Sequence, residues 1–394
     1  MNHLDDPHWM RQAVDRAGQV LYLTAPNPRV GCVIVRDGRI LGAGATQQAG
    51  GPHAEVMALR DMAARGNSAQ GATVYVTLEP CSHYGRTPPC ADALIAARPA
   101  RVVVAMPDPN PLVAGQGLAK LRAAGIDVAV SVCAAEALAL NPGFVARMTR
   151  QSPWVWLKLA ASLDGRTALH NGVSQWITGP AARADGHHWR ARSCVVLTGL
   201  GTVVADDPQL NVRLVSTPRQ PVRAVVDPRF EFPERARMID GGPIWLFTAR
   251  RDEAKAARLR ERNVTVVALP DQAARGDGPG AAGVSDRVDL PGMLRWMAGR
   301  DVNEVHVESG PGLAGALLQA GYVDELLVYM APMLLGDAQP MARLPGLDSL
   351  EQARRFDFFE TRELPPDVRL RARLPDRWRA LMDAVRPTGA AAQV

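Results

Sequence analysis

The sequence contains no run of eighteen apolar residues, so it predicts no membrane-spanning helix. Its first residues, "MNHLDDPHWMRQAVDRAGQ", lack the apolar core and the small-residue cleavage site of a signal peptide. Aromatic residues make up only 5% of the chain and the basic residues form no block, which argues against a nucleic-acid-binding surface. We therefore expect a cytoplasmic protein with neither nucleic acid nor membrane as a partner.

Lysine is scarce. The chain has three lysines, Lys120, Lys158 and Lys255, against 42 arginines, and a net charge of +5. Genomic base composition explains such a ratio without an evolved phosphate-binding face. The same ratio singles out Lys158, because it lies in a stretch, "WVWLKLAAS", that is otherwise apolar.

Cysteine is also sparse, and its number is odd. Five cysteines without a secretory signal make disulfides improbable, and they favour a metal or thiolate role for the close pair Cys81 and Cys90. We expect Cys32, Cys133 and Cys194 to be core residues.

The chain of 394 residues is longer than one hydrophobic core usually serves. Predicted strands alternate with predicted helices, which is typical of α/β domains, and the pattern restarts near residue 154. We expect two α/β domains, residues 1–147 and 148–375, joined around residues 146–153, and a flexible tail over residues 376–394.

A first candidate site combines "PHAEVMAL" with "EPCSHYGRTPPC". His53, Cys81 and Cys90 would give Zn²⁺ one imidazole and two thiolates, and three protein ligands leave a fourth position open, as in catalytic sites. Glu55 is placed to move a proton from water to a leaving amine. H-x-E followed by P-C and a second cysteine is typical of zinc deaminases, although the gap here is eight residues. The alternative is a chance grouping of a helix-terminal histidine and two buried cysteines.

A second candidate site is "VESGPGLAGALLQAG", which contains Gly310, Gly312 and Gly315. The glycines follow a predicted strand and begin a predicted helix, the context in which backbone N–H groups bind a diphosphate. The motif lies near the end of its domain, which argues against a standard Rossmann arrangement. The alternative is a glycine-rich helix start without a ligand. We expect His187 and His188 to lie on the surface.

Several stretches together resemble one family. "PNPRVGCVIV", "PHAEVMAL", "TLEPCSHYGRTPPC" and "DPNPLVAGQG" closely resemble the bacterial bifunctional riboflavin-biosynthesis deaminase/reductase family. "WLKLAASLDGRTA", "GVSQWITG" and "LTGLGTVVADDPQLNVR" resemble its reductase half, and the resemblance spans about residues 8–370. It implies a cytidine-deaminase-like N-terminal domain and a dihydrofolate-reductase-like C-terminal domain. It also implies zinc-dependent deamination of a diamino-hydroxy-phosphoribosylaminopyrimidine, followed by NADPH-dependent reduction of the ribosyl group to ribityl.

The resemblance implies roles for residues of the first domain. His53, Cys81 and Cys90 would hold one Zn²⁺ per chain, and Glu55 would be catalytic. The residues expected to contact the pyrimidine or its sugar phosphate are Asn27, Arg86, Asp108 and Asn110. Thr46 stands where the family usually has a histidine, so this side of the pocket departs from the family pattern.

The resemblance also implies roles in the second domain. The NADPH contacts would be Ala160, Trp176, Thr202, Asp206 and the loop Gly310, Pro311, Gly312, Leu313, Ala314, Gly315 and Ala316. The substrate contacts would be Ser174, Arg190, Leu210, Arg213 and Glu308, with the two arginines suited to the phosphate. Lys158 and Asp206 are the catalytic candidates of this half.

Two other readings remain at this point. One is a nucleic-acid base deaminase with an appended recognition domain, which the scarcity of aromatic residues disfavours. The other keeps the deaminase and makes the C-terminal half a non-catalytic domain that forms oligomers. The oligomeric state is left open, and a homo-oligomer is among the states that the sequence allows.

Overall fold

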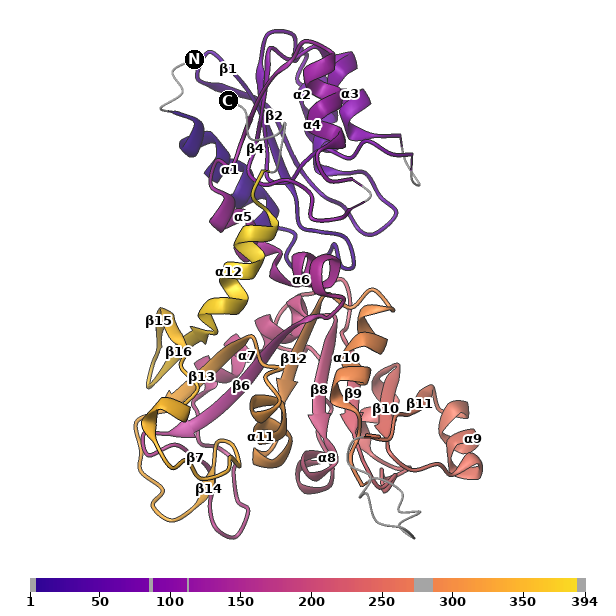
Figure 1. Cartoon of the computed structure of the whole chain (residues 1–394), viewed down its shortest axis with the longest axis vertical. Coiled ribbons are helices and arrows are strands. Elements are labelled where there is room, and N and C mark those ends of the chain that lie inside the picture. Colours follow the sequence, from indigo (N-terminus) through magenta and orange to yellow (C-terminus); the bar gives the residue numbers. More distant parts are fainter. Residues whose placement is uncertain (1–4, 85–87, 112, 273–285, 388–394) are drawn as a thin grey trace. The chain divides into compact units, whose positions relative to one another are not determined.

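The computed structural model describes residues 5–84, 88–111, 113–272 and 286–387. The chain divides into two compact units, one of residues 1–151 with 378–394 and one of residues 152–377 (Figure 1). The boundary after Gln151 lies four residues beyond the expected end of the first domain.

The first unit is an α/β layer structure. In chain order its elements are α1 (Asp6–Gly18), β1 (Gly31–Arg36), β2 (Arg39–Ala45), α2 (Ala54–Ala64), β3 (Thr73–Val76), α3 (Cys90–Ala97), β4 (Arg101–Val104), α4 (Gln116–Ala123), β5 (Asp127–Val130), α5 (Ala134–Leu140) and α6 (Pro142–Arg150). The sheet has the order β2-β1-β3-β4-β5, in which β3, β4 and β5 are parallel and β1 is antiparallel to both of its neighbours.

Glycines in β2 let helix α2 approach the sheet. A Cβ atom on Gly44 would lie 2.4 Å from the Ala58 nitrogen, and one on Gly42 would lie 2.5 Å from the Ala58 oxygen. Any larger residue would push α2 away. Because α2, α3 and α4 lie together on one face of the sheet (Figure 1), this close packing helps to place the N-terminus of α2 beside that of α3.

The second unit is built on a nine-stranded sheet. Its elements are β6 (Trp154–Ser162), β7 (Arg166–Ala168), α7 (Pro180–Arg192), β8 (Val195–Gly199), α8 (Leu200–Asp206), β9 (Val222–Val226), η2 (Arg237–Gly241), β10 (Ile244–Thr248), α9 (Glu253–Glu261), β11 (Val264–Ala268), α10 (Leu290–Ala298), β12 (Glu304–Glu308), α11 (Pro311–Gln319), β13 (Glu325–Ala331), β14 (Gln339–Pro340), η3 (Leu350–Gln352), β15 (Asp357–Leu364) and β16 (Asp367–Arg373).

The strand order is β11-β10-β9-β8-β12-β6-β13-β16-β15. The pairs from β11 to β13 are parallel, whereas β16 runs antiparallel to β13 and to β15. Successive residues of β8 join different apolar clusters, Val195 and Leu197 one and Val196 the other. Because strand side chains alternate between faces, the sheet has an apolar core on each side.

The end of the chain differs from the expectation. Residues 376–384, expected in a flexible tail, belong to helix α12 (Pro375–Ala384), and Leu381 and Val385 are each 2% exposed. Leu381 lies in the last turn of the helix and Val385 directly follows its end, so burying these two side chains orders the segment. Residues 388–394 lie outside the described residues.

No helix in the described part of the chain is long and apolar enough to cross a membrane. All five cysteines are free. Cys32 is fully buried, as expected. Cys133 is only half-buried, at the start of α5, so its assignment to the core was wrong; Cys194 is also half-buried but packs against an apolar cluster.

Candidate functional site

Three predicted metal ligands come together in the first unit. His53 directly precedes α2, Cys90 is the first residue of α3, and Cys81 follows β3. The Nδ1 atom of His53 lies 3.6 Å from Cys81 Sγ and 3.3 Å from Cys90 Sγ. Ligand bonds of about 2.0–2.1 Å for nitrogen and about 2.3 Å for sulfur in a tetrahedron separate such atoms by about 3.5 Å. The spacing and the donor types therefore fit Zn²⁺, and the group of three found among the described residues leaves a fourth position open.

The pKa values of the two thiols shift in opposite directions. Hydrogen bonds from Cys90 and then His53 lower the pKa of the Cys81 thiol, and the Cys90 N–H donates to Cys81 Sγ at 3.3 Å. The same contact with Cys81, together with burial, raises the pKa of Cys90. The helix N-termini at this point favour negative charge. A divalent cation bound here would displace the proton of the Cys90 thiol.

Glu55 lies in the first turn of α2 beside this group and is 3% exposed. Burial raises the pKa of its carboxyl to about 7. A carboxyl that titrates near neutral pH can accept a proton and also return it. The predicted catalytic glutamate therefore has the surroundings that its role requires.

Sequence reasoning missed Glu79, a buried residue directly before Pro80 and Cys81. Its Oε2 accepts the N–H groups of Asp108 at 3.1 Å and Gly115 at 3.0 Å, and its Oε1 accepts that of Gly117 at 2.9 Å. Glu79 thus holds the start of α4 and the Asp108 segment beside the end of β3. An acidic residue at the end of an apolar strand was the available signal.

The predicted pyrimidine contacts are partly described. Burial raises the pKa of Asp108 to about 7, and its Oδ1 accepts the Asn110 N–H at 2.8 Å. Asn27 closes a turn, where its N–H donates to the Thr24 oxygen at 2.9 Å. Thr46 is buried and donates its N–H to the Val30 oxygen. Arg86 lies outside the described residues. Contact of these residues with a substrate stays a prediction.

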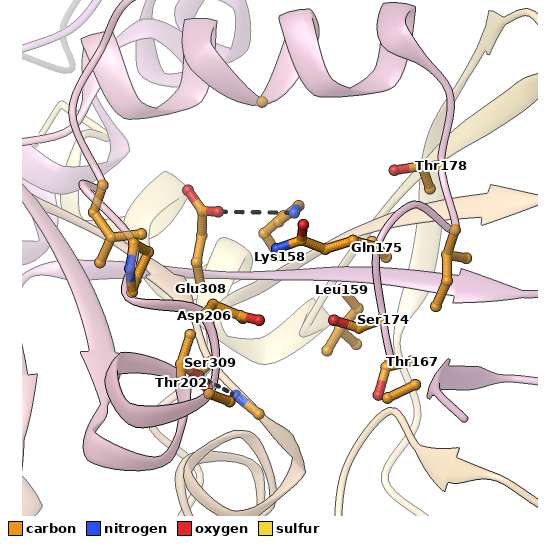
Figure 2. Close-up of a pocket in the computed structure, with 18 of the residues that line it drawn as sticks. Lys158, Leu159, Thr167, Ser174, Gln175, Thr178, Thr202, Asp206, Glu308 and Ser309 are labelled. Carbon is orange, nitrogen blue, oxygen red and sulfur yellow. Dashed lines mark hydrogen bonds and ion pairs between the residues drawn. The ribbon is translucent and has the colours of Figure 1, made fainter. Parts of the chain in front are cut away.

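The second unit contains a cavity of about 920 Å³. Figure 2 shows Thr202, Asp206 and Ser309 on one side of it and Thr167 and Ser174 on the other. The predicted reductase residues that line the cavity come from β6, α7, α8, β12, α11 and the segments between them: Lys158, Ala160, Ser174, Trp176, Arg190, Thr202, Asp206, Leu210, Arg213, Glu308, Gly310, Pro311, Gly312 and Leu313.

Three residues of the predicted cofactor loop do not line this cavity. Ala314 is fully buried in the core, and a Cβ atom on Gly315 would lie 2.0 Å from the Arg343 carbonyl oxygen. Ala316 is exposed elsewhere on α11. After the first turn of α11 the rotation of the helix turns these three positions away from the cavity. We therefore assign Ala314 and Gly315 to packing and Ala316 to the surface, instead of to cofactor contact.

The start of α11 forms an open cradle. A Cβ atom on Gly312 would find nothing within 4 Å, and the Gly310 N–H donates to Thr202 Oγ1 at 3.2 Å, which joins α11 to α8. Ser309 Oγ is buried and has no hydrogen-bond partner among the described atoms. First-turn amides, space for a close approach and an unpaired hydroxyl all fit the diphosphate of a dinucleotide.

A charged cluster lies next to this cradle. Glu308 Oε2 lies 2.9 Å from Arg190 Nη2. The same oxygen lies 3.7 Å from Lys158 Nζ (Figure 2). Burial alone would raise the pKa of Glu308, but Arg190 and Lys158 outweigh it and hold the pKa well below its usual range. Burial also raises the pKa of Asp206, the last residue of α8.

His187 was expected on the surface and is instead 4% exposed, with its ring against the cavity. Burial, and then the charges of Arg190 and Arg213, lower the pKa of His187 to about 4. The neighbouring His188 is exposed, as expected. Only one face of α7 packs against the sheet, so the rotation of the helix about its axis decides which of the two adjacent histidines is buried.

These two sites define an enzyme class: a zinc deaminase joined in one chain to a reductase that uses a nicotinamide cofactor. The family model for the cytidine and deoxycytidylate deaminase zinc-binding region matches residues 4–106, and that for the RibD C-terminal domain matches residues 153–370.

Similar proteins agree with this class. The chain is 47% identical over 379 residues to the riboflavin biosynthesis protein RibD of Escherichia coli K12, covering 93% of this chain and 98% of that protein. It is 42% identical to RibD of Haemophilus influenzae, covering 92% and 95%. The structure of Acinetobacter baumannii RibD, form 1, matches with a TM-score of 0.82 at 43% identity, covering 94% and 98%.

A diaminohydroxyphosphoribosylaminopyrimidine deaminase/5-amino-6-(5-phosphoribosylamino)uracil reductase from Thermotoga maritima matches with a TM-score of 0.82 at 30% identity, covering 95% of this chain and 100% of that one. The chain belongs to the RibD family of bifunctional deaminase/reductase enzymes of riboflavin biosynthesis. The expected fold class, a cytidine-deaminase-like domain followed by a dihydrofolate-reductase-like domain, is confirmed.

Proposed function

We propose that this chain deaminates diaminohydroxyphosphoribosylaminopyrimidine at the His53 site and reduces the resulting 5-amino-6-(5-phosphoribosylamino)uracil in the cavity of the second unit. The observation that carries the proposal is that one chain holds both a three-ligand metal group beside a buried glutamate and a glycine-rich helix start beside a charged cavity. The Thermotoga maritima relative, which covers nearly the whole chain, supports the choice of substrates.

In the deaminase half, His53, Cys81 and Cys90 would hold the zinc ion. Bound there, Zn²⁺ supplies a Lewis acid that makes water a nucleophile near neutral pH. Glu55 accepts the proton that the water loses and delivers a proton to the amine that leaves the ring as ammonia. The net change is hydrolytic, since one water is consumed, one ammonia is released and the ring carbon becomes a carbonyl.

In the reductase half, the first-turn amides of α11, Ser309 and Thr202 would hold the cofactor diphosphate. NADPH supplies the hydride that reduces the first carbon of the ribosyl group. Lys158 would donate a hydrogen bond to the sugar oxygen at that carbon, and Glu308 keeps the ammonium in place at 3.7 Å. Ser174, across the cavity from Thr202, would contact the substrate (Figure 2).

The charge of the cavity suits a phosphorylated substrate and an anionic cofactor. Six cationic side chains line it, against the three carboxylates of Asp206, Asp207 and Glu308. Arg190 is largely neutralised by its two hydrogen bonds to Glu308. Arg213 forms no ion pair among the described residues and donates to Asn211 Oδ1 at 3.1 Å, so we assign the substrate phosphate chiefly to Arg213.

For its setting, we propose the cytoplasm, because the five free cysteines suit a reducing compartment. The proposed partner is the small phosphorylated pyrimidine, with no nucleic acid involved; a second copy of the chain is the protein partner we would look for.

The test uses the purified full-length chain and both pyrimidines. With the diamino compound and NADPH, we expect ammonia release to precede the loss of NADPH absorbance. With the deaminated compound, NADPH should be consumed without ammonia release. Rapid NADPH consumption on the diamino compound without ammonia would contradict the proposed order, and inactivity on either compound would contradict that half of the proposal.

A further inference from the structure

The segment of residues 211–213 lines the reductase cavity through Arg213, yet it belongs to no helix or strand. Side chains hold its backbone. The Val212 N–H donates to Gln220 Oε1 at 2.7 Å, and Gln220 Nε2 donates to the Val212 oxygen at 3.0 Å. Val212 is itself buried, at 6% exposure. The Gln220 side-chain amide thus makes the two backbone hydrogen bonds that a neighbouring strand would otherwise make to Val212.

Helix α7 holds the residues on either side of Val212. Arg190 Nη1 donates to the Asn211 oxygen at 3.1 Å, and the Arg213 N–H donates to His187 Nδ1 at 3.2 Å. His187 and Arg190 are three residues apart in α7, so they project from the same side of the helix. The segment is therefore fixed to α7 at both of its ends.

The bond to Arg213 sets the state of the imidazole. Because Nδ1 accepts a hydrogen bond, the neutral ring must carry its proton on Nε2. His187 faces the cations Arg190 of α7, Arg213 of the held segment and Lys158 of β6, and the carboxylate of Glu308 of β12. Burial, and then the excess of positive charge, lowers the pKa of His187 and keeps the ring neutral, which keeps Nδ1 available to the Arg213 N–H.

We propose that His187 is a positioning residue of the reductase site, which holds residues 211–213 against α7 so that the Arg213 guanidinium faces the phosphate of the bound substrate. This inference rests on the proposed reduction of a phosphorylated pyrimidine. The contact through which His187 acts is a backbone N–H, so it does not occupy the Arg213 guanidinium, whose hydrogen bond goes to Asn211 Oδ1 and leaves its other N–H groups for the ligand. Without the acceptor, that N–H is left unpaired and the segment loses its fixed register on α7.

The test compares His187→Leu with His187→Gln in the full-length, zinc-loaded protein. Leucine removes the acceptor and keeps the bulk, whereas the glutamine amide oxygen can still accept the Arg213 N–H while remaining uncharged. The matched control is His188→Leu, which changes the adjacent exposed residue of the same helix. Steady-state kinetics with the deaminated pyrimidine and NADPH give KM for each ligand and kcat, and ammonia release reports the other half of the same molecule.

We expect His187→Leu to raise KM for the deaminated pyrimidine about tenfold, the effect of losing one buried acceptor. The KM for NADPH, kcat and ammonia release should change less than about twofold, and His187→Gln should restore KM to within about threefold of the unchanged protein. His188→Leu should change none of these values. An unchanged KM in a folded His187→Leu protein, equal changes in both KM values, or no rescue by glutamine would each overturn the proposal.

A double-mutant cycle tests the route through Arg213. In an Arg213→Gln background, His187→Leu should add little, because the side chain that it positions is already gone. Full additivity of the two changes would overturn the proposed route. The proposed function fails separately, since it fails only if the unchanged protein does not oxidise NADPH with the deaminated pyrimidine.

Discussion

Two glycines of helix α11, Gly312 and Gly315, allow the sharpest test of how the reductase half is built. Both belong to the same glycine-rich motif, and the resemblance assigned both to the cofactor. In the structure a Cβ atom at Gly312 meets nothing within 4 Å, whereas one at Gly315 would lie 2.0 Å from the Arg343 oxygen and 2.8 Å from its carbonyl carbon. The same substitution, glycine to alanine, should therefore have opposite effects at the two positions.

Gly315→Ala should lower stability. Overpacking typically costs about 1–3 kcal/mol, and alanine regains up to about 1 kcal/mol over glycine within a helix. The Arg343 N–H also donates to the Pro311 oxygen at 2.9 Å, so its backbone cannot withdraw freely. A net loss of about 1–2 kcal/mol corresponds to a fall in Tm of about 2–8 °C for a unit of this size.

Gly312→Ala should leave Tm unchanged or slightly raised, because the methyl group occupies open space at a helical position. That space is where the cofactor diphosphate would approach the backbone, so KM for NADPH should rise at least about tenfold, the equivalent of 1.4 kcal/mol. Thermal unfolding followed by circular dichroism and NADPH kinetics measure both effects. A normal Tm with a raised KM for Gly315→Ala, and no effect of Gly312→Ala, would refute the assignment of Gly315 to packing.

The remaining predictions concern the metal, the proton carrier and pH. Cys90→Ser should remove most of the one zinc expected per chain, because a hydroxyl is a poor substitute for thiolate, and full zinc occupancy by metal analysis would show that Cys90 is not a ligand. Glu55→Gln should lower ammonia release at least about a hundredfold while zinc content and reduction of supplied deaminated pyrimidine stay normal; near-normal deamination would exclude Glu55 as the proton carrier. Burial and the cations Arg190, Arg213 and Lys158, opposed by Glu308, lower the folded-state pKa of His187 from 6.5 to about 4. Between these pH values the unfolded chain binds a proton at this histidine that the folded chain does not, so the contribution of His187 to stability should fall as pH drops from 6.5 to 4, by up to about 3 kcal/mol. Glu55 and Asp108, whose pKa values are raised to about 7, contribute in the opposite direction, so the effect of His187 is measured as a difference from a variant that lacks it. Denaturant titrations at several pH values should show that the free energy of unfolding of the unchanged protein falls relative to that of His187→Leu as pH drops from 6.5 to 4, and an identical pH dependence of the two proteins would contradict this.

The sequence by itself determined the kinds of groups present and their local settings. One histidine and two cysteines, each predicted at a helix start or a strand end, define a zinc donor set, and Glu55 comes two residues after the histidine. Glycines that follow a strand and open a helix likewise indicate an anion site from local pattern alone. These inferences depend on residue type and short spacing, which the order of residues along the chain carries directly.

Partners far apart in the chain were decided by the tertiary structure alone. Arg190 and Glu308 are 118 residues apart and form a two-bond ion pair, and Glu79 caps a helix that begins 37 residues later. Neither residue type nor spacing specifies such partners, because each depends on how the strands are ordered in the sheet.

Tertiary packing alone also decided the rotation of each helix about its axis, and so which of its residues are buried. From the sequence, the glycine-rich motif assigned Gly312 and Gly315 to the same role, and His187 and His188 were both expected on the surface. In each pair the packed neighbours chose one: the Arg343 backbone fills the space beside Gly315, and the cavity wall takes His187 while His188 faces outward. A step of one residue turns a helix by about 100°, so the face that each side chain presents follows from which surface the whole helix buries.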